Sequence, residues 1–335
     1  MVNFSVFSSL PDIHYCPGTL KEGNKTYSAT ALKRVFKGKK VSHILPYESP
    51  ATNALTDELF ADNRKRMSIS GVQEKFSVLL DKNKLRLITE GEQGQYILKP
   101  QPSAGKHPEM MPANEHLTMQ IARQVFNIET AENALIFFRN GEPAYITKRF
   151  DVQDDNTKVA QEDFAALALR TPQTHGTNYK YLGNYYDLFV IMKKFVPAYN
   201  IEAPKLLKLI LFNYLFSNGD AHFKNFSLIQ TDFGDYKLSP AYDLLNSRIH
   251  IEDRDFALDD GLLPPALAKG KVHEQFYQLG ELAGINIKLI DNIFALLSSG
   301  KDDVLRLISH SYLSEKLKRN YEQAYLTRLK KLNRK

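Results

Sequence analysis

The chain has 335 residues, of which 43% are hydrophobic and 24% charged, and its formal net charge is +6. This composition excludes disordered, fibrous and disulfide-built proteins, and the length favours two domains over one compact core. Cys16 is the only cysteine, so neither an internal disulfide nor a multi-cysteine zinc site can form. The opening residues do not resemble a signal peptide, and no apolar run is long enough to span a bilayer. We therefore expect a cytoplasmic protein without a membrane partner.

The first 150 residues are expected to form a strand-rich lobe. Alternation of apolar and polar residues predicts two strands joined by a polar turn. A short apolar run predicts a third strand, and two more are expected around an Asn140-Gly141 turn. The expected strands are residues 76–80, 85–89, 96–98, 134–138 and 144–146. Between the third and fourth strands, apolar residues recur with helical spacing over residues 112–126, which predicts a helix. A basic amphipathic stretch, residues 28–45, precedes all of these elements.

The second part of the chain is expected to be mainly helical. A polar run at residues 151–158 is the best candidate for a linker. The expected helices are residues 162–169, 185–194, 203–216 and most of 272–335, with one pair of strands at 226–230 and 236–238. This order predicts an α+β fold of two lobes, residues 1–150 and 151–335, with a cleft between them.

The loop at residues 217–225 carries the most specific chemical pattern. Asp220 is followed five residues later by Asn225, which is the spacing of a kinase catalytic loop. In such a loop the aspartate accepts the proton of the substrate hydroxyl, and the asparagine holds a magnesium ion that bridges the phosphates. The alternative is an ordinary polar turn after a helix. The donors His222 and Lys224, and the strand that follows, favour the catalytic loop.

A second metal-binding aspartate is needed, and two candidates follow the loop. Asp232 opens the literal kinase triplet Asp-Phe-Gly, but it falls in the turn between the two expected strands, where a hairpin requires Asp and Gly. The return strand leads to Asp243, which the hairpin would place beside Asp220 and Asn225. We therefore predict that Asp243, and not Asp232, is the second metal ligand.

Lys99 and Glu115 form a candidate ion pair. Lys99 ends an apolar strand, as the phosphate-binding lysine of kinases does. Glu115 falls on the same helical stripe as Met119, Ala122 and Phe126, which predicts that it is buried. A buried carboxylate needs a partner, because unpaired burial is costly, and Lys99 is the natural one. The alternatives are a solvated lysine and an exposed glutamate stabilised by the helix dipole.

Residues 68–73, Ser-Ile-Ser-Gly-Val-Gln, are a candidate phosphate loop before the first strand. They contain a single glycine, so the kinase pattern Gly-x-Gly-x-x-Gly is absent, and a serine-rich turn is the alternative. The basic run at residues 64–66 would favour a phosphate nearby.

Eight short motifs, in their order along the chain, resemble the HipA family rather than the eukaryotic protein kinases. They are SISGVQEKFSVLL (68–80), YILKP (96–100), NEHLTMQIA (114–122), KRFD (148–151), QEDFAALAL (161–169), YLGNYYDLF (181–189), NGDAHFKNFSL (218–228) and SPAYDLL (239–245). The resemblance covers roughly residues 65–250. It implies a bilobal kinase-like fold and a serine/threonine protein kinase that uses ATP and Mg²⁺.

The resemblance also implies roles for single residues. Asp220 would be the catalytic base, and Asn225 and Asp243 the metal ligands. The implied ATP-binding residues are Ser70, Gly71, Val72, Gln73, Lys99, Lys148, Phe150, Asp151, His222 and Tyr242. Lys148 stands where HipA has a glutamate, although only backbone contacts to adenine are expected there. Ser68 and Ser70 would be sites of autophosphorylation.

The candidate phosphate loop begins near residue 68, too early in the chain for the extra N-terminal subdomain of HipA to precede it. In this respect the chain is similar to the short form of the family, called HipT. The resemblance then implies a toxin with two partners, a small HipS-like antitoxin and a HipB-like DNA-binding protein. DNA would be reached only through the latter. The implied substrate is an aminoacyl-tRNA synthetase, specific for tryptophan or for glutamate.

Two other functions are compatible with these residues. A small-molecule kinase of the aminoglycoside or choline type shares the Asp and Asn loop but gives no reason for paired serines in a phosphate loop. A DNA-associated scaffold with vestigial nucleotide binding would use the tail at residues 316–335. That tail holds eight basic residues, at 316, 318, 319, 328, 330, 331, 334 and 335, against Glu322 alone. The alternative for the tail is a solvated terminal helix.

Overall fold

The computed structural model describes residues 10–50, 74–251 and 254–333. The chain divides into two compact units. The first unit comprises Met1–Gln120, Ala131–Thr157 and Leu307–Lys318, and the second comprises Ile121–Thr130, Lys158–Arg306 and Arg319–Lys335. Within the described ranges, no helix combines the length and the apolar character needed to cross a bilayer.

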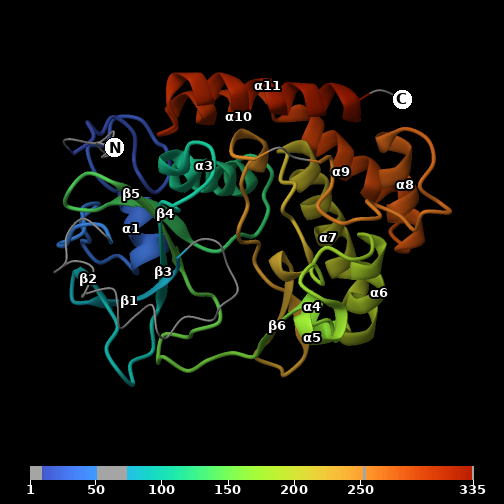
Figure 1. Ribbon diagram of the computed structural model, residues 1–335, viewed down its shortest axis with the longest axis horizontal. Coiled ribbons are helices and arrows are strands. Elements are labelled where there is room, and N and C mark those ends of the chain that lie inside the picture. Colours follow the sequence, from blue (N-terminus) through green and yellow to red (C-terminus); the bar gives the residue numbers. More distant parts are fainter. Residues whose placement is uncertain (1–9, 51–73, 252–253, 334–335) are drawn as a thin grey trace. The chain divides into compact units, whose positions relative to one another are not determined.

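The first unit is built on a five-stranded antiparallel sheet, which lies among the blue and green elements of Figure 1. Its strands are β1 (Phe76–Asp81), β2 (Lys84–Leu87), β3 (Tyr96–Pro100), β4 (Asn133–Phe137) and β5 (Pro143–Lys148). Their order across the sheet is β2-β1-β3-β5-β4. The hairpin between β1 and β2 pairs Asp81 with Lys84 at its turn, so the expected polar turn is confirmed.

Helix α1 and the sheet share the larger apolar cluster of the first unit. Helix α1 (Ala29–Phe36) begins at Ser28, whose side chain accepts a hydrogen bond from the Ala31 N–H, and it contacts β4. Helix α3 (Met111–Gln124) follows a short 3₁₀ turn, η1 (Pro108–Met110). The cluster contains Phe36 of α1 together with apolar residues of all five strands. The basic stretch before the strands therefore contributes to the core.

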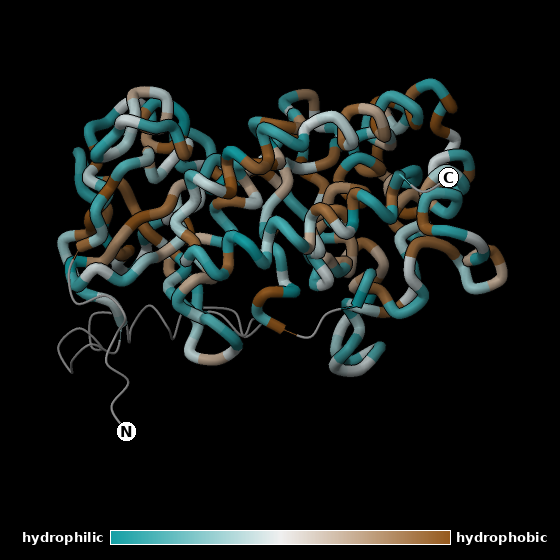
Figure 2. Tube along the Cα trace, turned by 90° about the horizontal axis from the view of Figure 1, so that it is seen from above, coloured by the Kyte–Doolittle hydropathy of each residue, from teal (hydrophilic) through white to brown (hydrophobic). Residues whose placement is uncertain are grey.

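The second unit is mainly helical, as the sequence predicts. Its helices are α4 (Phe164–Leu167), α5 (Pro172–His175), α6 (Tyr186–Phe195), α7 (Tyr199–Leu215), α8 (Val272–Leu282) and α9 (Ile287–Ser299). Two further helices, α10 (Lys301–His310) and α11 (Glu315–Leu332), each have residues in both units. Hydrophobic and hydrophilic residues both occur along the helical parts of the chain (Figure 2), and α6, α8 and α9 each bury one apolar face.

A three-stranded antiparallel sheet corrects one expected helix. Its strands, in spatial order, are β6 (Gln161–Asp163), β7 (Ser227–Gln230) and β8 (Tyr236–Leu238). The helix expected at residues 162–169 is wrong at its start, because Glu162 pairs with Leu228 in the sheet. Asp163 then caps the short helix α4 by accepting a hydrogen bond from the Ala166 N–H. Pairing with a strand 66 residues away overrides the local helical propensity.

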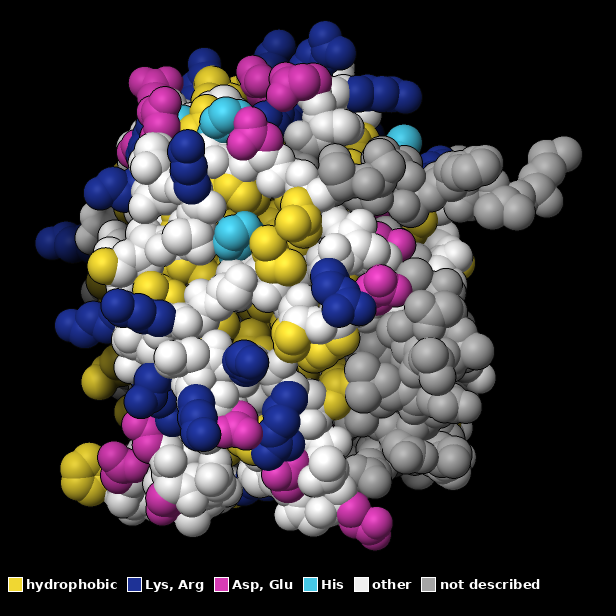
Figure 3. All heavy atoms as spheres, turned by 90° about the vertical axis from the view of Figure 1, so that its left-hand side faces the viewer, with side chains coloured by type: hydrophobic (Ala, Val, Ile, Leu, Met, Phe, Trp, Pro, Cys, Tyr) yellow, Lys and Arg dark blue, Asp and Glu magenta, His cyan; other side chains and the backbone are white. Residues whose placement is uncertain are grey.

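The C-terminal helix differs from the solvated terminal helix that was one interpretation of the basic tail. Most of the basic tail is helix α11, but one face of α11 is packed rather than solvated, because Leu317, Tyr321, Tyr325 and Leu332 are all buried. Arg328 is buried with them. Elsewhere, basic and acidic side chains are interspersed on the face drawn in Figure 3, in keeping with 44 basic and 38 acidic residues.

Candidate active site

The loop with Asp220 leaves the end of helix α7 in a fixed direction. Helix α7 ends at Leu215, and Ser217 then adopts a left-handed backbone conformation with φ of 52°. The Asn218 N–H donates to the Asn213 carbonyl at 2.8 Å, and the Asn218 amide donates to the Asn213 side-chain oxygen at 2.9 Å. Since α7 is buried along most of its length, these bonds tie the loop to a rigid element.

The backbone on both sides of Asp220 is held by hydroxyl groups. The Ser247 hydroxyl donates to the Ser217 carbonyl at 3.0 Å and accepts a hydrogen bond from the Gly219 N–H at 2.8 Å. On the other side, the Tyr185 hydroxyl donates to the Ala221 carbonyl at 2.7 Å. Hydrogen bonds therefore hold the backbone on both sides of Asp220, while the Asp220 carboxylate stays partly exposed.

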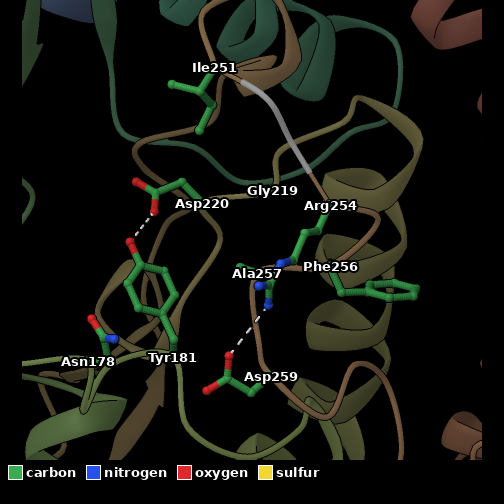
Figure 4. A pocket seen from close by; sticks show the side chains of 9 residues that line it. All are labelled: Asn178, Tyr181, Gly219, Asp220, Ile251, Arg254, Phe256, Ala257 and Asp259. Atoms are coloured by element: carbon green, nitrogen blue, oxygen red, sulfur yellow. Dashed lines mark hydrogen bonds and ion pairs between the residues drawn. The ribbon is translucent and has the colours of Figure 1, made fainter. Parts of the chain in front are cut away.

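Two neutral side chains lie beside the Asp220 carboxylate. The Tyr181 hydroxyl donates to Oδ1 of Asp220 at 2.7 Å (Figure 4). Burial, and then this hydrogen bond, raise the pKa of Tyr181, so the hydroxyl keeps its proton near neutral pH. Nε2 of His222 lies 3.9 Å from the same oxygen. Burial lowers the pKa of His222 to about 4, so this imidazole is neutral at pH 7.

Asn225 and Asp243 lie next to each other. Asn225 ends the 3₁₀ turn η2 (Phe223–Asn225), and its Nδ2 lies 3.5 Å from Oδ2 of Asp243. The hairpin of β7 and β8 returns the chain to this point. Asp243 has a left-handed backbone conformation with φ of 55°, and its carbonyl accepts a hydrogen bond from the Asn218 amide at 3.4 Å. Left-handed residues other than glycine are uncommon and cluster at functional sites.

The donor atoms of Asn225 and Asp243 fit a magnesium ion. Carboxylate and amide oxygens are the ligands that Mg²⁺ prefers, usually together with water and the phosphates of a substrate. The Asn225 amide directs its nitrogen to Asp243, while its oxygen accepts a hydrogen bond from the His222 N–H at 3.1 Å. In a magnesium complex the side-chain oxygen of Asn225 and the carboxylate of Asp243 would be the protein ligands.

The literal Asp-Phe-Gly triplet is a hairpin turn. The Thr231 N–H donates to the Asp235 carbonyl at 2.7 Å, and Gly234 adopts φ of 85°, which closes the turn between β7 and β8. The Phe233 side chain is 95% exposed. Asp232 therefore lies at the tip of the hairpin, and the hairpin predicted from the sequence is confirmed.

In the first unit, Lys99 of β3 and Glu115 of α3 form a buried ion pair. Lys99 Nζ lies 2.6 Å from Glu115 Oε1, and the two residues are only 4% and 3% exposed. Lys99 Nζ also lies 5.2 Å from the centroid of the Tyr145 ring. Because an isolated charge at this depth is strongly disfavoured, each residue depends on the other. The exposed-glutamate alternative is therefore wrong.

The remaining candidate ATP-binding residues are distributed over both units. In the first unit the Lys148 N–H donates to the Glu132 carbonyl at 2.7 Å, and Asp151 forms an ion pair with Arg149 at 2.5 Å. Phe150 lies between them in the sequence. In the second unit the Tyr242 hydroxyl donates to the Lys224 carbonyl at 2.9 Å. Ser68, Ser70, Gly71, Val72 and Gln73 lie outside the described residues.

A cavity of about 310 Å³ opens beside Asp220 within the second unit. It is lined by Asn178, Tyr181, Gly219, Asp220, Ile251, Arg254, Phe256, Ala257 and Asp259 (Figure 4). Arg254 points towards Asp259, with 3.8 Å between their closest charged atoms. This wall of the cavity and the role of Tyr181 are not predictable from the sequence, because both reach Asp220 only through long-range contacts. Tyr181 opens the motif at residues 181–189, but nothing local marks its hydroxyl as a partner of Asp220.

Residues 67–299, more than half of the chain, match the family described as the HipA-like C-terminal domain, so the chain belongs to that family. It is 24% identical over 313 residues to a Haemophilus influenzae protein named "Putative kinase", with 86% of this chain and 87% of that protein covered. It is 32% identical over 192 residues to "Putative kinase Y4mE" of Sinorhizobium fredii, and there 54% of this chain and 43% of that protein are covered. The chain thus spans less than half the length of the Sinorhizobium relative.

Among solved structures, the chain is similar to a chain of the Shewanella oneidensis MR-1 toxin–antitoxin complex of HipA, HipB and operator DNA. The TM-score is 0.61 at 20% identity, and the match covers 79% of this chain and 64% of that chain. This similarity confirms the predicted α+β, HipA-like fold. The family and the curated relatives together support a kinase.

Proposed function

We propose that the chain is a serine/threonine protein kinase that uses ATP and Mg²⁺. The observation that carries the proposal is the 3.5 Å approach of Asn225 to Asp243, on the loop system that also holds Asp220. A catalytic base and a pair of oxygen ligands from two neighbouring loops are what phosphoryl transfer requires. Membership of the HipA-like family supports the same activity.

In the proposed reaction, Asp220 accepts the proton of the acceptor hydroxyl as its oxygen attacks the γ-phosphorus of ATP. The new P–O bond forms while the bond to the bridging oxygen of ADP breaks, and ADP leaves with the electron pair. Asn225 and Asp243 would hold Mg²⁺, which neutralises charge on the phosphates. Tyr181 orients the Asp220 carboxylate, and the cavity beside Asp220 gives the acceptor its route of entry.

The proposed nucleotide contacts come from several segments. Lys99 would bind phosphate oxygens, with Glu115 holding its ammonium in place. Residues 68–73 would cover the phosphates, and the backbone of Lys148 and Phe150 would contact adenine. Further proposed ATP contacts come from Asp151, His222 and Tyr242.

We further propose that the kinase is the toxin of a toxin–antitoxin system, closest to the short form HipT. The similar Shewanella oneidensis structure contains HipA with HipB and operator DNA, which supports a HipB-like DNA-binding partner. By family resemblance, a HipS-like small protein would be the antitoxin. An aminoacyl-tRNA synthetase, tryptophanyl or glutamyl, would be the substrate. DNA would be contacted through the HipB-like partner.

The test is mass spectrometry of the chain and of its Asp220→Asn variant after incubation with ATP and Mg²⁺. We expect phosphate on Ser68, Ser70 or both in the unaltered chain and on neither serine in the variant. A phosphoserine there adds about −1.5 to −2 charges beside the nucleotide phosphates, so it should change activity. Equal phosphorylation of chain and variant would contradict the role of Asp220. If the chain phosphorylates another protein but neither serine, the autophosphorylation proposal fails.

A further inference from the structure

Arg328 is the most deeply buried charged residue of helix α11. The residue is only 1% exposed, although arginine is almost never fully buried without a partner. One guanidinium nitrogen lies 2.6 Å from Oδ1 of Asp255, and the group lies 4.6 Å above the Tyr214 ring. Nε of Arg328 donates to the Ser217 hydroxyl at 3.4 Å. All four residues belong to the second unit.

The contact to Ser217 leads directly to the catalytic loop. Ser217 has φ of 52°, a conformation that persists only when its surroundings hold it. Its carbonyl accepts hydrogen bonds from the Ser247 N–H at 3.1 Å and from the Ser247 hydroxyl at 3.0 Å. The same hydroxyl accepts a hydrogen bond from the N–H of Gly219, the residue before Asp220. Arg328 is thus connected to the residue before the proposed catalytic base by three successive hydrogen bonds, through Ser217 and Ser247.

The contact to Asp255 leads to the cavity beside Asp220. Arg254 and Phe256, on either side of Asp255 in the chain, line that cavity together with Ala257. Phe256 is stacked on Tyr214 at 5.3 Å between ring centroids, so this segment is docked against α7. Asp255 itself is half-exposed and also lies 3.7 Å from Lys331. One guanidinium therefore connects the loop that carries Asp220 with the segment that forms a wall of the acceptor cavity.

Stability alone gives no reason for a buried arginine at this position. Burial of the guanidinium costs desolvation energy, and an apolar side chain of similar size at this position would avoid that cost. An apolar side chain would fill the volume and cover Tyr214. It could not form both the ion pair with Asp255 and the hydrogen bond to Ser217, which a planar guanidinium makes with two different nitrogens.

We propose that Arg328 is a positioning residue, which fixes the catalytic loop and the wall of the acceptor cavity relative to each other through Ser217 and Asp255. The effect on catalysis rests on the proposed kinase function, whereas the coupling of the two segments does not. Helix α11 is then part of the catalytic apparatus and not a separate basic tail. A misplacement of about 1 Å in such a site can cost about 100-fold in rate.

The experiment compares Arg328→Met and Arg328→Lys with Lys330→Met, a control that removes a positive charge from the exposed face of the same helix. Three properties are measured: the unfolding temperature, hydrogen–deuterium exchange of residues 214–222 and 254–259, and the single-turnover rate of ³²P transfer from [γ-³²P]ATP to the chain. We expect Arg328→Met to exchange faster in both segments and to lose about 10- to 100-fold in rate while folded. Arg328→Lys should recover part of the rate, and Lys330→Met should match the unaltered chain.

Unchanged exchange in both segments, with an unchanged rate per folded molecule, would overturn the proposal. A lower unfolding temperature with a normal rate would show that Arg328 has a structural role only, and this result would also overturn the proposal. If Arg328→Met does not fold, the same three measurements are made on Asp255→Asn. This variant should fold, because the Asp255 side chain is half-exposed and the arginine stays in place. If no phosphoryl transfer is found in the unaltered chain, the proposed function fails, and exchange still tests the coupling.

Discussion

Asn225 and Asp243 are 18 residues apart in the chain, yet the amide nitrogen of Asn225 lies 3.5 Å from a carboxylate oxygen of Asp243. The hairpin of β7 and β8 produces this approach, because its antiparallel strands, which pair Leu228 with Leu238, return the chain to the region that it left. The same hairpin carries Asp232 to its tip. The position of each aspartate in the hairpin, and not the Asp-Phe-Gly motif, therefore decides which of the two is the candidate metal ligand.

The ion pair of Lys99 and Glu115 predicts that substitutions can change protein stability and ATP affinity independently of each other. Lys99→Ala leaves the Glu115 carboxylate buried without its cation, which should cost about 3–5 kcal/mol of unfolding free energy and weaken ATP binding. Glu115→Ala should weaken ATP binding in the same direction but less. The double variant Lys99→Met with Glu115→Met should regain most of the stability and none of the ATP affinity. Urea denaturation and ATP titration measure the two effects, and normal ATP affinity in the double variant would remove Lys99 from the nucleotide site.

The hydrogen bond from Tyr181 to Asp220 predicts a defect in turnover. Tyr181→Phe keeps the ring but removes the donor, and a hydrogen bond to a charged group contributes about 1.5–3 kcal/mol. We expect kcat for phosphoryl transfer to fall about tenfold or more, with little change in the KM for ATP. Tyr236→Phe on strand β8 is the matched control and should behave as the unaltered chain. An unchanged kcat in Tyr181→Phe would show that Asp220 needs no support from this hydroxyl.

The burial of His116 leads us to predict how the unfolding free energy of the protein depends on pH. It lies on α3, and burial lowers its pKa to about 3, whereas in the unfolded chain it titrates near 6.5. Between these values the unfolded state binds the extra proton, so stability falls as the pH drops below about 6.5. This one group should cost about 2 kcal/mol between pH 7 and pH 5. Urea denaturation at both values should show this loss reduced in His116→Gln and retained in His175→Gln, an exposed control. An equal loss in His116→Gln would contradict the assignment.

Local patterns predicted most of the strands and the hairpin that discards Asp232. Turn chemistry and the two-residue period act over a few residues, so the sequence alone is sufficient there. The burial of Glu115 was also predictable, because one apolar stripe on a helix shows which side faces the core. Strand β6 was not, since residues 161–163 are strand only through pairing with β7.

The missed residues of the site share one physical cause. Tyr181 contacts Asp220 across 39 residues, and Arg328 contacts Ser217 across 111 residues. Nothing in the neighbourhood of either residue distinguishes it from a surface tyrosine or from one charge of a basic tail. Such contacts arise from tertiary packing, so they become visible only when the fold is known.

The most direct test compares Asp243→Ala with Asp232→Ala in transfer of ³²P from [γ-³²P]ATP in the presence of Mg²⁺. Both variants remove one aspartate from the same hairpin system, and circular dichroism checks that both are folded. We predict that Asp243→Ala loses at least about 100-fold in rate, because a metal ligand is removed, while Asp232→Ala stays within about twofold of the unaltered chain. Activity retained without Asp243 and lost without Asp232 would contradict the proposed site.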